Sequence, residues 1–247
     1  MASITVEHLT KQYPTGTLAL DDVNLTIEEG EFIAIVGPSG CGKSTMLRIM
    51  AGLEDASGGR VAFAGAAARS GELPSAVVFQ EQSLFPWMRV GENVAFAFDS
   101  LPVPAGEVRR RVRETLGLVG LADYERAWPH ELSGGMKQRA AVARAFAVDP
   151  PVLFMDEPFG ALDEQTRVGL ANELMRLWER SPKTVVFVTH GIEEAVTLAD
   201  RVIVLSSRPG KIKAVIPVEF PRPRDAVAIR AEPGFGEHVV RIWELLA

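Results

Sequence analysis

The chain of 247 residues contains one cysteine, no long apolar run and no excess of basic residues. Because Cys41 is the only cysteine, no intrachain disulfide can form, and a reducing compartment is allowed. The apolar runs fall far short of the roughly 18 to 20 residues that a membrane-spanning helix requires. Residues 1–7 also lack the basic and apolar regions of a signal peptide. We therefore expect a protein that stays in the cytosol.

The shortage of positive charge argues against a nucleic-acid partner. The formal net charge is −6, which gives no bulk attraction to a polyanion. The densest basic cluster, residues 109–113, lies among apolar residues at helical spacing and has no interleaved aromatic residue. We interpret it as the solvated face of an amphipathic helix, and a nucleic-acid site is the weaker alternative.

The length and the hydrophobic fraction of 47% suit one large α/β domain spanning residues 1–247. Period-two alternation over residues 4–27 predicts antiparallel strands around a turn, and later apolar runs alternate with helical patterns, as in a parallel sheet. We expect a loop over residues 64–74, a mainly helical insertion over 86–134, and a tail with a short helix over 219–247. The expected later strands are residues 32–36, 61–63, 76–79, 152–155 and 185–188, followed by a closing hairpin of 202–205 and 212–218.

A glycine-rich segment directly follows the apolar run of residues 32–36. Its glycines precede Lys43 and Ser44 at the spacing of a P-loop, in which backbone N–H groups and a helix N-terminus cradle phosphate oxygens. In that geometry Lys43 would reach the β- and γ-phosphates, and the Ser44 hydroxyl would face Mg²⁺. A flexible glycine turn is the alternative, which the preceding strand and the helical spacing that follows disfavour. The predicted phosphate loop comprises Gly37, Pro38, Ser39, Gly40, Cys41, Gly42, Lys43, Ser44 and Thr45.

Three features allow both a structural and a functional interpretation. A helix N-terminus could lower the pKa of the Cys41 thiol, although we favour a tolerant loop position for this residue. Tyr13 ends the first strand and could either stack on a purine base or simply occupy a strand edge. The apolar stretch of residues 84–88 is either local core or a surface for a partner, and taken alone we favour core.

The ends of four apolar runs carry groups suited to phosphate chemistry: the P-loop, Gln80, Asp156-Glu157 and Thr189-His190. Since ligands of parallel α/β sheets lie outside the carboxyl ends of the strands, these groups should meet at one edge. Asp156 can hold Mg²⁺, Gln80 can complete metal or water contacts, and Glu157 can deprotonate the attacking water. His190 can bond the γ-phosphate or that water. A histidine at a strand end is more often structural, but the convergence favours the functional role.

A second glycine pair opens a helix later in the chain. Ser133 is predicted to cap this helix. Capping does not explain Gly134 and Gly135, since each glycine in an opening turn costs up to about 1 kcal/mol relative to alanine. Close approach of the backbone to a ligand would explain both.

Together these motifs resemble the ATP-binding subunit of ABC transporters, and the resemblance covers nearly the whole chain. It implies an α/β fold: a P-loop NTPase core with a mainly parallel sheet, an N-terminal antiparallel β-subdomain and an inserted α-helical subdomain. One departure is Met136, where the commonest signature has glutamine. The resemblance assigns Gln80 to the Q-loop, residues 132–135 to the signature and 161–163 to the D-loop, and it makes His190 the switch histidine and Tyr13 the adenine-stacking aromatic.

The resemblance implies ATP and Mg²⁺ as ligands and ATP hydrolysis as the activity. It also implies a head-to-tail dimer, of two copies or with a similar ATPase subunit, in which Ser133, Gly134 and Gly135 of one copy complete the ATP site of the other. Separate transmembrane permease subunits would dock beside Gln80, which favours a partner-facing role for part of residues 84–88. The chain would then sit at the cytoplasmic face of the inner membrane, and a solute-binding protein would take part indirectly.

Three segments, residues 85–87, 156–163 and 208–211, look most like the importers of nitrate, sulfonates and taurine. We therefore predict an ATPase that energises the uptake of such a solute. The alternatives are another solute, export, an ABC ATPase that acts on nucleic acid or the ribosome, and a nucleotide-binding scaffold without turnover. The basic extensions or paired cassettes of the nucleic-acid class are not visible in the sequence, and Glu157 and His190 argue against a scaffold.

Overall fold

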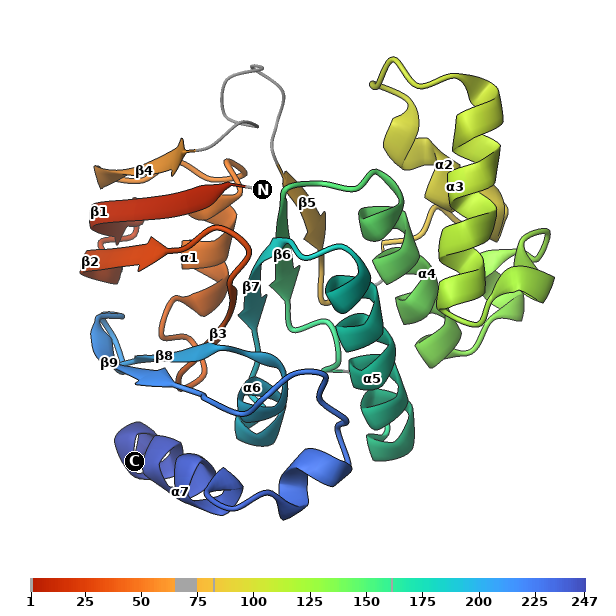
Figure 1. Ribbon diagram of the computed structural model, residues 1–247. Helices are drawn as coiled ribbons and strands as arrows, with labels where there is room; N and C mark the ends of the chain where they lie inside the picture. The colour runs from red at the N-terminus through yellow and green to blue at the C-terminus, as the bar shows by residue number, and fades with distance from the viewer. Residues whose placement is uncertain (1, 65–74, 82, 161) are drawn as a thin grey trace.

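The computed structural model describes residues 2–64, 75–81, 83–160 and 162–247. Residues 65–74, which the sequence predicts to be loop, and Ala161 of the predicted D-loop lie outside this range. The described residues form two sheets and the helices that cover them (Figure 1). None of the described helices is both long enough and apolar enough to cross a membrane.

The N-terminal sheet is antiparallel, as the alternating pattern predicts. Its strands are β1 (Ser3–Gln12), β2 (Leu18–Ile27) and β4 (Gly58–Ala64), in the order β2-β1-β4. Ile4 lies opposite Ile27, and Val6 lies opposite Leu25. These side chains are buried on one face while their neighbours in sequence face outward, which is the condition that produces a period of two.

The central sheet is parallel except at one edge. Its strands are β3 (Phe32–Val36), β5 (Ser75–Val78), β6 (Val152–Asp156), β7 (Thr184–Val188), β8 (Arg201–Leu205) and β9 (Ile212–Pro217), in the order β5-β6-β7-β3-β8-β9. Only β9 runs antiparallel to its neighbour, so β8 and β9 form the predicted closing hairpin. Strand β5 ends at Val78, and Phe79 is already outside it and 36% exposed.

Continuous apolar runs arise here because both faces of the sheet are covered. Phe32, Ala34 and Val36 of β3 belong to one buried cluster, and Ile33 and Ile35 belong to the other. Figure 1 shows the two coverings, with α1 and the antiparallel sheet on one side and α4 and α5 on the other. The helices are α1 (Lys43–Met50), α2 (Val90–Ala95), α3 (Ala105–Leu118), α4 (Gly134–Ala147), α5 (Glu164–Arg180), α6 (Ile192–Leu198) and α7 (Phe235–Leu246).

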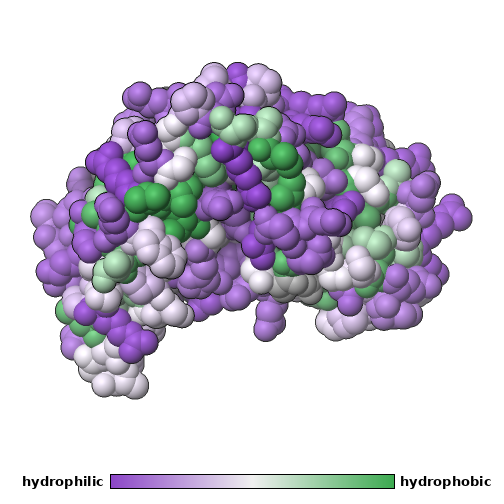
Figure 2. Space-filling view, turned by 90° about the horizontal axis from the view of Figure 1, so that it is seen from below, coloured by the Kyte–Doolittle hydropathy of each residue, from purple (hydrophilic) through white to green (hydrophobic). Residues whose placement is uncertain are grey.

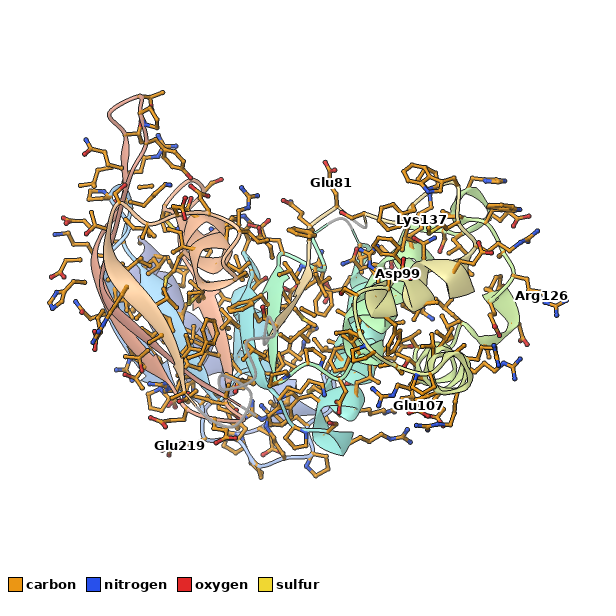
Figure 3. All side chains as sticks on the ribbon, turned by 90° about the horizontal axis from the view of Figure 1, so that it is seen from above. Glu81, Asp99, Glu107, Arg126, Lys137 and Glu219 are labelled. Atoms are coloured by element: carbon orange, nitrogen blue, oxygen red, sulfur yellow. The ribbon has the colours of Figure 1, made fainter. Side chains whose placement is uncertain are left out.

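Residues 86–134, all of which are described, contain α2, α3 and short 3-10 turns that pack beside α4. The turns are Phe96–Phe98, Ala122–Tyr124 and Pro129–Glu131, and a further one lies at Ala228–Ala231 before α7. Seen from above, this helical part lies on the opposite side of the central sheet from the antiparallel sheet (Figure 3). Glu107 and Arg126 lie in that part, whereas Glu219 lies far from it (Figure 3). The exact subdomain boundaries remain a prediction.

The predicted solvated face of α3 carries ion pairs. Arg110 bonds both Glu107 and Glu114, and Arg111 also bonds Glu107. Hydrogen bonds from Arg110 and then Arg111 lower the pKa of Glu107 to about 2. Two of the four arginines are therefore paired with carboxylates of their own helix, which weakens the attraction of this face to a polyanion.

The stretch of residues 84–88 is not simply core, contrary to the interpretation from the stretch alone. Trp87 is 68% exposed, and its ring stacks against Phe85 at 5.4 Å between centroids. The Phe85 ring in turn meets Phe96 edge-on at 4.6 Å, and Phe96 is also exposed. Asn93 fixes the stretch, since its side chain bonds both the N–H and the carbonyl of Phe85.

The C-terminal tail is anchored rather than free. The segment of residues 221–224, which looks like a linker in sequence, carries the buried Arg224, whose guanidinium donates to four backbone carbonyls. Burial lowers the pKa of Arg224 to about 10. Arg222 pairs with Asp200 at 2.8 Å, so two arginines hold the tail against the end of α6. The face seen from the side of α7 is mainly hydrophilic with separate apolar patches (Figure 2).

Candidate functional site

A cavity of about 530 Å³ lies where β3, β6 and β7 end, beside the start of β2. The parallel pairing of β5, β6, β7 and β3 brings the four predicted strand endings to one edge. The cavity is lined by Tyr13, Thr17, Leu18, Ala19, Ser39, Gly40, Gly42, Lys43, Ser44, Thr45, Gln80, Glu157, His190 and Arg208. Residues far apart in the sequence thus converge as predicted.

The glycine-rich segment wraps around the buried Lys43. The Lys43 ammonium donates to the carbonyls of Gly37 at 2.9 Å and Pro38 at 3.2 Å. Gly42 precedes α1 with φ of +99°, and a Cβ there would lie 2.8 Å from the Ala19 carbonyl oxygen. Glycine is therefore required both by the left-handed backbone and by the neighbouring strand. Such a loop presents a cation and the N-terminus of α1 to the cavity.

Cys41 lies in this loop but does not line the cavity, and nor do Gly37 and Pro38 among the described loop residues. The thiol is 1% exposed, and burial raises its pKa. The lowered pKa, the less favoured of the two interpretations, is therefore wrong, because desolvation outweighs the opposing effects of the Lys43 charge and of backbone hydrogen bonds. A Cβ added at Gly37 would lie 2.6 Å from Cys41 Sγ, so the sulfur fills the space behind the loop.

Ser44, in the first turn of α1, meets Asp156, the last residue of β6, at the edge of the cavity that Ser44 lines. The Ser44 hydroxyl donates to Asp156 Oδ1 at 2.7 Å, and Arg48 lies 3.9 Å from the other oxygen. The Asp156 side chain is 5% exposed. No group of three or more His, Cys, Asp or Glu residues suited to a metal occurs in the described parts of the chain. A hydroxyl and one carboxylate fit an ion such as Mg²⁺, which takes its remaining ligands from phosphate oxygens and water.

Glu157 and His190 form the best-defined pair in the cavity. His190 Nε2 lies 2.6 Å from Glu157 Oε1, with side chains 50% and 12% exposed. Glu157 has φ of +47°, and its N–H donates to the Val188 carbonyl at 2.9 Å. A left-handed backbone is unfavourable for glutamate, so the neighbouring strand must hold it there. The result is a carboxylate aimed into the cavity beside an imidazole.

Tyr13 and Gln80 both line the cavity. The Tyr13 hydroxyl lies 3.1 Å from Thr45 Oγ1, and its ring lies 5.1 Å from the Lys11 ammonium. Gln80 also lines a second cavity of about 480 Å³, which shares Glu157 and His190 with the first. Both residues are thus placed beside the phosphate loop, and their roles remain predictions.

Ser133, Gly134 and Gly135 are not brought to the cavity within one chain. Ser133 caps α4 as predicted, since its hydroxyl accepts from the Met136 N–H at 3.3 Å. A Cβ at Gly135 would lie 2.5 Å from Thr166 Cγ2, so contact with α5 explains that glycine. Nothing among the described residues lies within 4 Å of a Cβ at Gly134. Contacts within one chain therefore do not explain why position 134 is a glycine.

Sequence reasoning missed several cavity residues. Arg208 lies in the loop between β8 and β9, where the sequence indicates a turn and a resemblance to one group of importers but no role at the nucleotide. Glu194 lines the second cavity, where burial raises its pKa against the opposing effects of Thr189 and Arg167. Arg167 lies 3.2 Å from the Glu194 carboxylate and also donates to the Leu162 carbonyl. It therefore joins the segment before α5 to the segment that carries His190.

Comparison with known proteins supports the same interpretation. The family model of ABC transporters matches residues 20–160. The chain belongs to this family. It is an ATP-binding subunit of an ABC transporter and an ATPase. An uncharacterised ABC transporter ATP-binding protein of Methanocaldococcus jannaschii is 45% identical over 92% of this chain and 86% of its own length. The aliphatic sulfonates import ATP-binding protein SsuB of Bacillus licheniformis is 48% identical over 84% and 80%.

Solved structures agree on the fold. A dimeric structure of MJ0796, a bacterial ABC transporter cassette, is 35% identical with a TM-score of 0.76, over 88% of this chain and all of that one. A dimeric structure of the same cassette in a post-hydrolysis state with ADP and Pi is 33% identical, with a TM-score of 0.75 and the same coverage. The predicted α/β fold with a mainly parallel sheet and an antiparallel N-terminal sheet is confirmed.

Proposed function

We propose that this ATPase energises the import of an aliphatic sulfonate or a similar small solute such as nitrate or taurine. The proposed solute class rests on the similarity to SsuB, which is 48% and 41% identical to this chain in two Bacillus species. The observation that carries the chemistry is the meeting of Lys43, Glu157 and His190 in one cavity.

In the proposed site, the phosphate chain of ATP lies over the glycine-rich loop. Backbone N–H groups at the start of α1 and the Lys43 ammonium bind its oxygens, and Tyr13 stacks on the adenine. Ser44 and Asp156, assisted by Gln80, hold Mg²⁺, which neutralises charge on the phosphate oxygens when bound. The hydrogen bond between Ser44 and Asp156 already places both oxygen ligands side by side.

Hydrolysis in this proposal depends on Glu157. Its carboxylate accepts the proton of the attacking water, and a base placed in this way contributes about 10²- to 10⁴-fold. His190, bonded to Glu157, keeps the carboxylate oriented and contacts the γ-phosphate or the water. The strained backbone at Glu157 supports this role, because strain of this kind concentrates at functional sites.

The second wall of the site comes from another copy or a similar ATPase subunit. Ser133, Gly134 and Gly135 would close the cavity of the partner in a head-to-tail dimer. Two observations support this arrangement: the absence of these residues from their own chain's cavity, and the open space around Gly134. The dimeric state of the MJ0796 cassette agrees with it.

Transmembrane permease subunits would bind the aromatic cluster of Phe85, Trp87 and Phe96, which lies close to Gln80 in sequence. The Trp87 and Phe96 rings of this cluster are exposed, and Phe85 is half-buried. Exposed aromatic rings of this kind are typical of protein interfaces. The chain would then lie peripherally at the cytoplasmic face of the inner membrane, and a solute-binding protein would act on the far side without contacting it.

The test compares Glu157→Gln with the parent chain in its transporter. We expect ATP binding to be retained and ATP hydrolysis to fall by about 10²- to 10⁴-fold. Cells that depend on this chain should also lose growth on an aliphatic sulfonate as the only sulfur source, while growth on sulfate persists. Glu219→Gln is the matched control, because this exposed carboxylate follows the end of β9 that pairs with the start of β8, away from the strand ends that border the cavity.

Each part of the proposal can fail separately. Hydrolysis at the parent rate would contradict the role of Glu157. Unchanged growth on sulfonate, together with lost hydrolysis, would contradict the solute class and leave the ATPase assignment in place.

A further inference from the structure

The loop between β8 and β9 is a rigid turn. Ser206 organises it, because its hydroxyl donates to the Pro209 carbonyl at 2.9 Å and accepts from the Lys211 N–H at 3.0 Å. The backbones of Ser206 and Lys211, which lie at the two ends of the turn, are also bonded, because the Ser206 N–H donates to the Lys211 carbonyl at 2.8 Å. The position of Arg208 inside this turn is therefore fixed by its neighbours and does not depend on a flexible loop.

The turn is also fastened to the wall of the cavity. The Gly210 N–H donates to the Ala19 carbonyl at 2.9 Å, and the Gly210 carbonyl accepts from the Asp21 N–H at 3.1 Å. A Cβ at Gly210 would lie 2.1 Å from the Cys41 carbonyl oxygen. Only glycine allows the turn to pack this closely against the glycine-rich loop.

Arg208 uses this placement to reach the glycine-rich loop. Its Nε donates to the Gly40 carbonyl at 3.3 Å. A Cβ at Gly40 would lie 2.6 Å from Arg208 Nη2, so the glycine makes room for the guanidinium. Arg208 also lines the cavity in which Lys43 lies. Two cations on separate elements therefore border the same space.

The terminal nitrogens of Arg208 have no hydrogen-bond or carboxylate partner among residues 2–64, 75–81, 83–160 and 162–247. Lys211 of the same turn, in contrast, is paired with Asp21 at 2.6 Å. An unpaired guanidinium beside a phosphate-binding loop offers a planar fork of donors that matches phosphate oxygens.

We propose that Arg208 is a second phosphate-contacting cation of the nucleotide site and adds to Lys43 in binding the phosphate chain of ATP or ADP. This inference rests on the proposed nucleotide site. It goes beyond that site because it adds a loop from the far edge of the sheet, to which the sequence analysis assigns no contact with the nucleotide.

The experiment measures nucleotide affinity with a fluorescent ATP analogue on the isolated full chain at low protein concentration. We expect Arg208→Ala to bind ATP and ADP about 5- to 20-fold more weakly, which is the range for one exposed charge-assisted contact. Arg208→Lys should recover part of this affinity because it keeps the charge and loses the fork. Lys213→Ala removes an exposed charge from the same hairpin and should leave the affinity unchanged.

Competition by adenosine, which carries no phosphate, separates direct contact from distortion of the cavity. Adenosine affinity should be the same in Arg208→Ala and the parent. If Arg208→Ala lost adenosine affinity and ATP affinity to the same extent, the inference would be overturned. Unchanged ATP affinity would also overturn it, even if the variant formed dimers less well. Lys43→Ala is the check on the site itself: ATP binding at parent affinity in that variant would overturn the nucleotide site and this inference together.

Discussion

Replacing Gly210 by alanine tests how tightly the turn between β8 and β9 is packed on the glycine-rich loop. The new Cβ would lie 2.1 Å from the Cys41 carbonyl oxygen, whereas real Cβ contacts stay above 3.0 Å. One of the two backbones must therefore move by about 0.9 Å, the difference between these distances. Both are restrained, because the Gly210 N–H and carbonyl are bonded to β2 and the Cys41 N–H donates to the Pro38 carbonyl. Overpacking of this kind costs about 1–3 kcal/mol.

For a chain of this size, each kcal/mol lowers the melting temperature by about 2–4 °C. Gly210→Ala should therefore melt roughly 2–12 °C below the parent in a thermal shift assay. The matched control is Gly169→Ala, since nothing among the described residues lies within 4 Å of a Cβ there and the position is inside α5. This control should gain about 0.5–1 kcal/mol from helix propensity. A Gly210→Ala melting temperature at or above the parent value would refute the packing argument.

Two further predictions concern buried titratable groups. The Cys41 thiol, buried and with its pKa raised, should react with iodoacetamide at least about 100-fold more slowly in the folded chain than in denaturant, and equal rates would contradict its burial. The pKa of Glu194 is also raised, so the Glu194 carboxyl binds its proton more tightly in the folded chain than in the unfolded chain. The contribution of this group to the free energy of unfolding therefore falls as pH rises from the ordinary glutamate pKa through the raised pKa. Urea unfolding of Glu194→Gln between about pH 4 and pH 7 should show a smaller fall than the parent, and an identical fall would refute the assignment.

The sequence predicts the features that depend on local patterns and on parallel strand order. The alternating pattern of β1 and β2 and the cap at Ser133 are local, and both are present. The meeting of Glu157 and His190 follows from a general property of parallel sheets, because β6 and β7 are neighbours and end at one edge. Chemistry placed at strand ends can therefore be located without knowing any side-chain distance.

Features that depend on contacts between distant segments were not predictable. Arg208 reaches the cavity because Gly210 pairs with Leu20, and no periodic pattern marks an isolated pairing across so long a separation. The same holds for Arg224, whose segment looks like an exposed linker until backbone carbonyls of α6 and its surroundings are seen to bind the guanidinium. At Cys41, the sequence shows the nearby helix N-terminus and Lys43 but not the burial that raises the pKa of the thiol.

The backbone of Glu157 and the glycine at position 134 both lower the stability of the isolated chain. Glu157 adopts a left-handed backbone although it is not glycine, and it is held there by the Val188 carbonyl. Gly134 lies at the start of α4, where alanine would fit without a clash and would form a better helix. Neither feature stabilises the isolated chain, since each costs folding free energy. In the proposed function, contacts that form only on binding compensate these two costs. ATP would supply them at Glu157, and a second copy would supply them at Gly134.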